Sequence, residues 1–368
     1  MKSFDYLAAF YRHEHNSREF VSQVDSLLAA EEASVRAIPF GCEKASLDWL
    51  DGKVCGDKKV TLLYCKDHLA AFRLDYTFTE NGQEKSETGR FFVMQQADLP
   101  NVFVAFSLES AQFFRRALQP FLLSLYPTVM MTFVSHRKMK RMLDAFKTEG
   151  NFSDLIITRA SQRLRYQEGN QTKRIMPMVS WPDMNLDEAF QWIQDHNGWF
   201  QSLEFEAMSR ERRLGTIVLT RQGIVRADAL FSRAYQTFIV PTCKTIGANL
   251  KLFSNRARLE RPDASALPLV IDFEADQFHD VQENRRLIQA MRLFKSASVS
   301  VLHGNPYVHL SVLDYIDGSA FDLWVLDHRQ LVIVPQLKAS IAAIKRLINH
   351  IFDDYAEGRL LDYQPPQT

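Results

Sequence analysis

The sequence predicts an α+β fold in which antiparallel meander sheets are each covered by a long helix. Segments of alternating or continuous apolar residues come in consecutive groups separated by short turns, which join only antiparallel neighbours. Each group is followed by a segment whose apolar residues recur every three or four positions, which is the period of a helix. This topology recurs about three times, with the covering helices near 109–125, 229–253 and 336–357.

The first group follows two helices expected over 3–13 and 17–31. Asn81-Gly82 is typical of a tight hairpin turn between two of its strands. Pro120 lacks the N–H that a helix interior needs, so we expect the covering helix to kink or begin there. Strands are expected over 60–65, 69–79, 84–95 and 101–106.

The second group contains two capped helices before its covering helix. Ser135 is expected to cap the first of them, and Asn185 forms a capping box with Glu188 in the second. Asp228 is expected to cap the covering helix, which Pro241 interrupts. Strands are expected over 128–134, 155–167, 173–181, 199–208, 214–220 and 224–226.

The third group follows a polar segment, 256–265, which is typical of a linker. Asp280 is expected to cap a helix. Pro335 is expected at the first position of the last long helix, and Gly358 at its end. Strands are expected over 267–273, 299–302, 308–315, 321–326 and 331–334.

The composition is that of a globular protein, with 46% apolar and 24% charged residues among 368. The uncharged segment 117–135 has the length of a membrane span, but Pro120 and Pro127 favour a buried helix followed by a buried strand. The four cysteines form no C-x-x-C motif, and the first residues lack the apolar run of a secretion signal. We therefore expect reduced thiols, a cytoplasmic location and no membrane association.

The charge distribution divides the chain into three parts. Residues 1–110, with the N-terminal helices and first meander, hold 12 basic and 17 acidic residues. The central region 111–262 holds 23 basic and 13 acidic residues, so it carries about +10. The C-terminal α+β domain, 263–368, holds 9 basic and 14 acidic residues. The neutral total therefore conceals a basic centre between two acidic parts, which predicts an anionic partner.

Two segments concentrate the basic residues that we expect to contact phosphates. One is the helix after Ser135, and the other is the strand from Leu155, where residues two apart on one face are spaced by about 6.6 Å. Two further cations return on the partner strand. The expected nucleic-acid-binding residues are Arg137, Lys138, Lys140, Arg141, Arg159, Arg163, Arg165, Lys173 and Arg174.

These features favour a non-catalytic protein that binds nucleic acid, DNA or RNA, through the phosphate backbone. One alternative is a subunit of a larger assembly whose basic centre docks an acidic protein partner. Another is a metal-dependent hydrolase that uses Asp272 and Glu274, which alternate with Asp276 along an expected strand. The sequence contains no P-loop, no dinucleotide-binding G-x-G-x-x-G after a strand, no H-E-x-x-H and no G-x-S-x-G, and we expect no cofactor.

Overall fold

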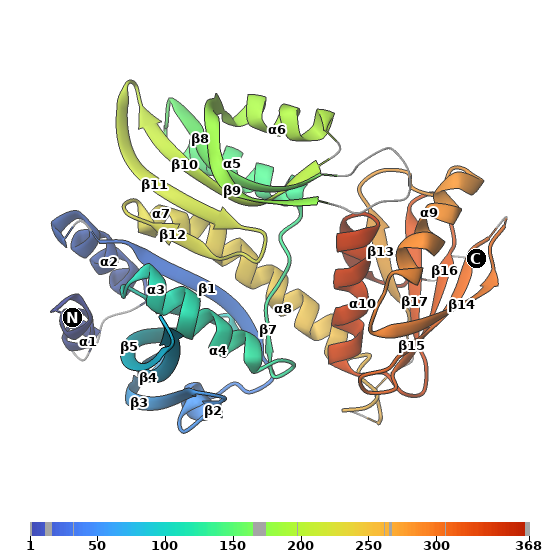
Figure 1. The fold of residues 1–368 in the computed structure, drawn as a ribbon, viewed down its shortest axis with the longest axis horizontal. Coiled ribbons are helices and arrows are strands. Elements are labelled where there is room, and N and C mark those ends of the chain that lie inside the picture. Colours follow the sequence, from blue (N-terminus) through green and yellow to red (C-terminus); the bar gives the residue numbers. More distant parts are fainter. Residues whose placement is uncertain are drawn as a thin grey trace. The chain divides into compact units, whose positions relative to one another are not determined.

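The computed structural model confirms the α+β class and describes residues 2–11, 17–31, 33–164, 174–196, 198–260, 262–264, 267–305 and 307–364. The chain separates into two compact units, Met1–Gly247 and Ala248–Thr368, which we call unit 1 and unit 2. Each unit contains one antiparallel sheet with helices packed on it (Figure 1). The sheet of unit 1 includes strands from both sides of residue 110, where the charge pattern changes.

The first and second meanders of the chain join into one sheet in unit 1. Its strand order is β2-β3-β4-β5-β6-β1-β12-β11-β10-β8-β9, and β7 pairs with β1. The strands are β1 (Val35–Cys42), β2 (Val54–Cys55), β3 (Lys58–Lys66), β4 (Leu69–Glu80), β5 (Gln83–Gln96), β6 (Leu99–Ser107), β7 (Val129–Met130), β8 (Asp154–Leu164), β9 (Arg174–Asn185), β10 (Gly198–Ser209), β11 (Arg212–Thr220) and β12 (Val225–Ala227).

Helices cover both faces of this sheet. The helical segments are α1 (Lys2–Tyr11), α2 (Ser17–Glu31), the 3₁₀ helix η1 (Leu47–Leu50), α3 (Ala111–Phe113), the π-helix η2 (Phe114–Leu118), α4 (Gln119–Ser124), α5 (His136–Glu149), α6 (Leu186–Asp195), α7 (Phe231–Ala234), the π-helix η3 (Tyr235–Ile239) and α8 (Val240–Ser254). None of the helices in the described residues combines the length and apolar character that crossing a membrane requires.

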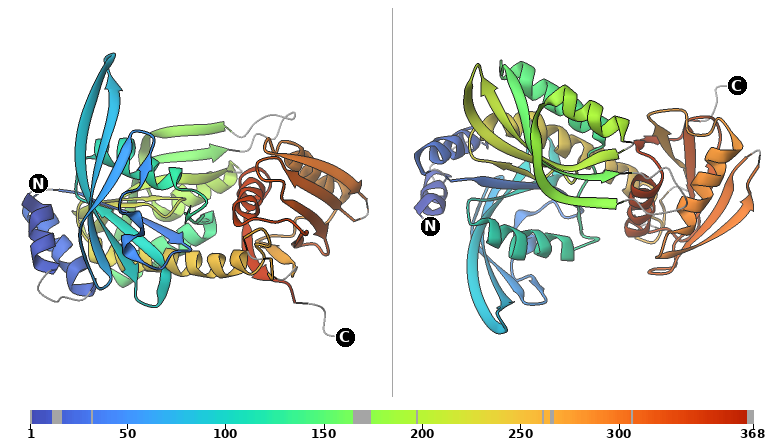
Figure 2. Two further views of the ribbon diagram at one scale, coloured as in Figure 1. Left: turned by 90° about the horizontal axis from the view of Figure 1, so that it is seen from below. Right: turned by 45° about the horizontal axis from the view of Figure 1, so that its top comes forward.

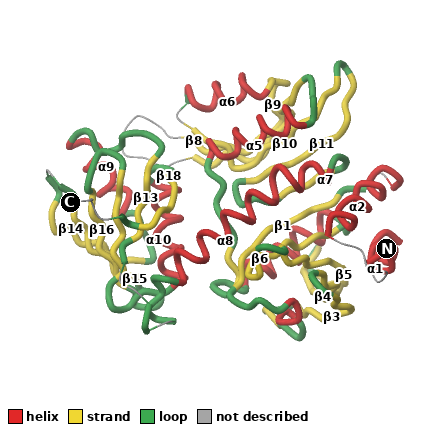
Figure 3. Tube along the Cα trace, turned by 180° about the vertical axis from the view of Figure 1, so that it is seen from behind, coloured by secondary structure: helices red, strands yellow, loops and turns green. Residues whose placement is uncertain are grey.

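The two faces of the first meander have separate apolar cores. Ile38 and Phe103 pack with Phe121 in the core beneath α3, η2 and α4. On the other face, Phe106 lies 6.1 Å from Phe20 of α2 and 5.9 Å from Phe231 of α7, measured between ring centroids. Figure 1 and Figure 3 view the sheet from opposite sides. The meander's β4–β5 hairpin is long, as the left view of Figure 2 shows.

The predicted disturbance at Pro120 is a single π-helical turn, and the same device recurs at Pro241. The N–H of Gln119 donates to the Phe114 carbonyl five residues back, and the N–H of Val240 donates to that of Tyr235. A proline follows at once in both cases. Proline has no N–H to donate, so it interrupts the regular series of helical hydrogen bonds. The wider π-helical turn accommodates this interruption.

Unit 2 repeats the topology of the first meander. Its strand order is β14-β15-β16-β17-β13-β18, so β13 pairs with the last meander strand as β1 pairs with β6. A covering helix follows that strand in both units. The elements are β13 (Leu269–Phe273), α9 (Val281–Arg292), β14 (Ala297–His303), β15 (His309–Asp314), β16 (Ala320–Val325), β17 (Gln330–Pro335), α10 (Ile341–Asp354) and β18 (Gly358–Asp362).

Three predicted element ends are wrong. Pro335 ends β17, where it pairs with Phe321, and Ser340 caps the helix instead. Gly358 opens strand β18 rather than ending the helix. Asp228 bonds to the N–H of Thr216 and does not cap the covering helix.

That cap comes from a distant part of the chain. The carboxylate of Asp25 in α2 accepts the N–H groups of Phe231 and Ser232 at the start of α7. The expected strand over 128–134 is short, and only Val129–Met130 pairs with β1. Strand β1 itself was not predicted. Among the confirmed signals, Asn81 and Gly82 both have positive φ, as their hairpin turn requires.

Candidate anion-binding face

Helix α5, which carries four of the predicted phosphate contacts, packs on one face of the second half of the sheet. Ser135 caps it by accepting the N–H of Lys138, as its sequence predicts. Its buried residue Phe146 lies 5.9 Å from Phe205 of β10 and 5.0 Å from Phe238 of η3, between ring centroids. The cations of α5 therefore lie on the Phe205 side of the sheet.

Two of these cations have partners within the chain. The ammonium of Lys140 lies 2.8 Å from Asp187 and 3.4 Å from Asp144. The ammonium of Lys138 donates to the Pro241 carbonyl and to Thr245 Oγ1, and its burial lowers its pKa to about 8. Lys138 thus fastens α5 to α8. The remaining two cations, Arg137 and Arg141, are exposed.

Strand β8 places its arginines on the opposite face of the same sheet. Ile157 pairs with Phe205 and Arg159 pairs with Glu204, so Thr158 forms a bulge between them. The bulge shifts the alternation by one residue. Before the bulge the odd-numbered residues Leu155 and Ile157 are buried. After the bulge the even-numbered residues Ala160 and Gln162 are buried. Arg159 and Arg163 consequently face away from Phe205 and from α5.

The remaining predicted contacts are only partly described. Arg165 and Lys173 lie outside the described residues. Arg174 pairs with Leu164 in the backbone register of β8 and β9. The predicted residues on α5 and those described on β8 therefore do not form one patch, because the two groups lie on opposite faces of the sheet.

A row of charged residues crosses the face that carries Arg159. Backbone register joins Arg159 to Glu204, Glu204 to Val218, Val218 to Arg226 and Arg226 to Arg36. The Glu204 carboxylate lies 4.0 Å from the Arg159 guanidinium and 3.8 Å from that of Arg226. These side chains are 13%, 48% and 37% exposed in that order, so one half-buried carboxylate lies between two accessible cations. We call this surface the arginine face.

Three cations of the arginine face were missed in the sequence. Arg36 comes from β1, Arg226 from β12 and Arg115 from η2. Burial and the nearby charges of Arg226 and Arg115 lower the pKa of Arg36 to about 10. Arg36 donates one hydrogen bond to the Glu109 carbonyl at 3.0 Å. The buried Nε of Arg226 has no hydrogen-bond partner within the described part of the chain.

Trp199 does not offer an open stacking surface on this face, and Trp181 packs on the α5 side of the sheet. Trp199 is 5% exposed, and the guanidinium groups of Arg163 and Arg221 lie 5.8 and 5.0 Å from its ring centroid. Trp181 packs edge-on against Phe200, with ring centroids 5.3 Å apart. The ring of Trp199 thus helps to hold Arg163 in position, and the face presents charge rather than stacking surface.

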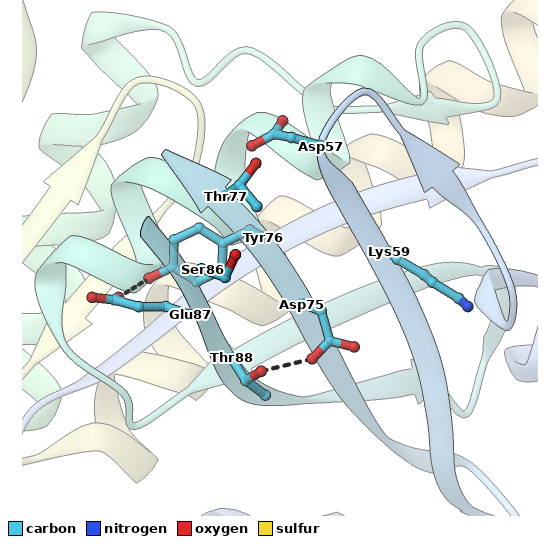
Figure 4. Close-up of a pocket in the computed structure, with 8 residues that line it drawn as sticks. All are labelled: Asp57, Lys59, Asp75, Tyr76, Thr77, Ser86, Glu87 and Thr88. Atoms are coloured by element: carbon cyan, nitrogen blue, oxygen red, sulfur yellow. Dashed lines mark hydrogen bonds between the residues drawn. The ribbon is translucent and has the colours of Figure 1, made fainter. Parts of the chain in front are cut away.

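A shallow pocket of about 380 Å³ lies elsewhere, over β3, β4 and β5 (Figure 4). Its lining is acidic, with Lys59 as its one basic residue. The Tyr76 hydroxyl donates to Glu87 at 2.6 Å, and the Thr88 hydroxyl donates to Asp75 at 2.7 Å. The polar groups of the pocket thus bind one another, and its charge disfavours an anionic ligand.

The carboxylates considered for a metal do not form a row in unit 2. Strand β13 ends at Phe273, so the alternation does not extend to Glu274 and Asp276. Asp272 instead lies 2.8 Å from Arg359 and 3.8 Å from Arg329. Among the described residues, no group of three or more His, Cys, Asp or Glu side chains gathers closely enough to hold a metal ion.

No protein-family model matches this chain, and no curated protein matches its sequence. The arginine face is therefore characterised by its own geometry alone.

Proposed function

We propose that this protein binds nucleic acid without catalysis, through phosphate contacts on the arginine face. The observation that carries the proposal is the set of five arginines on this face, two of which pair with the Glu204 carboxylate. The five are Arg36, Arg115, Arg159, Arg163 and Arg226. Guanidinium groups present several donors in a fixed plane, which suits phosphate oxygens.

The expected binding mode follows from what the face carries. Phosphate contacts position a nucleic acid but do not distinguish sequences, which requires groups that reach base edges. Trp199 is covered and does not supply a stacking surface. We therefore propose binding with little sequence preference. The four cysteines are unpaired, which is consistent with a reducing compartment such as the cytoplasm.

The test is binding of labelled single-stranded and duplex oligonucleotides, followed by fluorescence anisotropy at low salt. We expect Arg159→Glu with Arg163→Glu to weaken binding at least about tenfold, because two attractive charges become repulsive. The matched control is Arg137→Glu with Arg141→Glu, which makes the same charge change on α5. The proposal fails if neither nucleic acid binds, or if both double variants weaken binding equally.

A second candidate function is that of an assembly subunit that docks an acidic protein partner on the same face. Glu204 favours it, since this carboxylate already lies between Arg159 and Arg226. The two candidate functions predict different relative affinities for an acidic polypeptide and an oligonucleotide. An acidic polypeptide such as polyglutamate should bind more tightly than an oligonucleotide of equal charge only if carboxylates are the preferred ligands. The reverse order supports nucleic acid.

A further inference from the structure

Two arginines are direct neighbours in the centre of the unit 1 sheet. Arg36 of β1 and Arg226 of β12 are paired in the antiparallel register, and both side chains lie on the arginine face. Like charges that are directly opposite each other on adjacent strands are destabilising. Arg115 of η2 adds a third positive charge that acts on Arg36. The fold therefore maintains a repulsive cluster.

Within the described residues two contacts to this cluster are present, and only one of them is to a charged group. Arg36 donates a hydrogen bond to the backbone carbonyl of Glu109. This carbonyl carries no net charge. The Glu109 carboxylate accepts the N–H of Arg90 at 3.3 Å. In the described part of the chain the ion-pair contact of the cluster is Glu204, and its 3.8 Å distance from Arg226 is longer than a hydrogen bond. The Arg226 side chain is 37% exposed, so its guanidinium can still be reached by a ligand.

We propose that Arg36, Arg115 and Arg226 form a discrete site for a phosphoryl group, and that Glu204 is an internal counter-ion that competes with it. A terminal phosphate carries close to two negative charges near neutral pH and offers three strong acceptor oxygens. Guanidinium groups, with several donors in one plane, match this chemistry. When the phosphoryl group binds, it replaces Glu204 as the nearest anion of Arg226, so the carboxylate opposes binding by repulsion.

This proposal deepens the proposed function, because the site lies on the face assigned to nucleic acid. It adds that the centre of that face recognises one phosphoryl group and that Glu204 limits the affinity. The group can come from a nucleic-acid end or from a small phosphate. The experiment therefore compares inorganic pyrophosphate with an oligonucleotide bearing a 5′-phosphate and the same oligonucleotide with a 5′-hydroxyl.

The test is calorimetric titration of the full chain with these three probes. We expect Arg36→Gln to weaken pyrophosphate binding at least about tenfold, because a charge-assisted hydrogen-bond donor is lost. We expect Glu204→Gln to tighten it about five- to tenfold, because the substitution removes a nearby negative charge without changing side-chain shape. Arg36→Lys keeps the charge, so its affinity for pyrophosphate should lie between those of wild type and Arg36→Gln. Arg141→Gln on α5 is the control and should leave the affinity for pyrophosphate unchanged.

The outcomes separate this site from the proposed function. If pyrophosphate binds with this pattern but neither oligonucleotide binds, the phosphoryl site stands and nucleic-acid binding fails. A terminal phosphate is favoured if the 5′-phosphorylated probe binds more tightly than the 5′-hydroxyl probe, and a backbone phosphate if they bind equally. The site is overturned if pyrophosphate does not bind, or if Arg36→Gln and Glu204→Gln leave its affinity unchanged, even where oligonucleotides bind through Arg159 and Arg163.

Discussion

Arg256 is one of the most fully enclosed charged side chains among the described residues of unit 2, at 1% exposure. It donates to the Leu252 carbonyl at 3.0 Å, to the Pro268 carbonyl at 2.8 Å and to Asp362 at 2.7 Å. We predict that Arg256→Met lowers the free energy of unfolding by about 2–3 kcal/mol, because buried carbonyls lose their donor. Asp362 is 63% exposed, so Asp362→Asn should cost less than about 1 kcal/mol. Urea unfolding of both variants measures this contrast, and equal losses would contradict it.

His136 gives unit 1 a dependence on pH. Burial, with a smaller effect from the Arg221 charge, lowers its pKa to about 4, below the ordinary value near 6.5. Because the folded chain binds this proton less readily than the unfolded chain, the stabilisation is complete above about pH 6.5 and is lost as the pH falls towards 4. We predict that His136→Phe loses less stability over this interval than wild type does. The centroid of the His136 ring lies 4.6 Å from that of Phe190 and 5.8 Å from that of Phe200. A phenylalanine ring is therefore compatible with this aromatic surrounding.

The measurement for His136 is thermal unfolding of both proteins at several pH values between 4 and 8. Parallel curves for wild type and His136→Phe would exclude the histidine as the source of the acid sensitivity.

At the scale of elements, the first covering helix docks on the sheet at a glycine. A Cβ on Gly89 of β5 would lie 2.2 Å from ring atoms of Phe113, so the ring occupies the space of the missing side chain. We predict that Gly89→Ala lowers stability by about 1–3 kcal/mol through overpacking. Adding Phe113→Leu should recover part of that loss, since the smaller side chain makes room. A double-mutant cycle by urea unfolding measures the coupling, and strictly additive losses would contradict direct packing.

Local signals predicted many elements but not the strand that joins them. The hairpin at Asn81 and the capping box at Asn185 follow from chemistry within a few residues, and both are present. Strand β1 contains Pro39, and proline argues against a central strand. It is tolerated because β12 pairs only with Val35–Ala37 and β7 only with Gly41 and Cys42, so no ladder runs past Pro39 on that edge. Such an arrangement is decided by tertiary pairing.

At the scale of the molecule, the candidate site was predictable only in part. The alternation of Arg159 and Arg163 was visible in the sequence, but the bulge at Thr158 that sets their face was not. Arg36, Arg115 and Arg226 are single charges in separate parts of the chain, brought together by the pairing of β1 with β12 and by the docking of η2. The net charge of residues 111–262 therefore indicated that the site is positive, but it could not indicate which surface of the protein carries the site.

This arrangement makes the salt dependence of binding a measure of the whole face. Five arginines less the charge of Glu204 correspond to about four neutralised phosphates. With a slope of about −0.7 per phosphate on a single strand, log Kobs should fall against log salt concentration with a slope of about −3. Glu204→Gln should steepen the slope by about 0.7, Arg36→Gln should reduce it by the same amount, and Arg141→Gln on α5 should leave it unchanged. Anisotropy titrations across a salt series test all four proteins together. A slope near zero, or one that responds to Arg141 as strongly as to Arg36, would show that the charges of this face are not what holds the ligand.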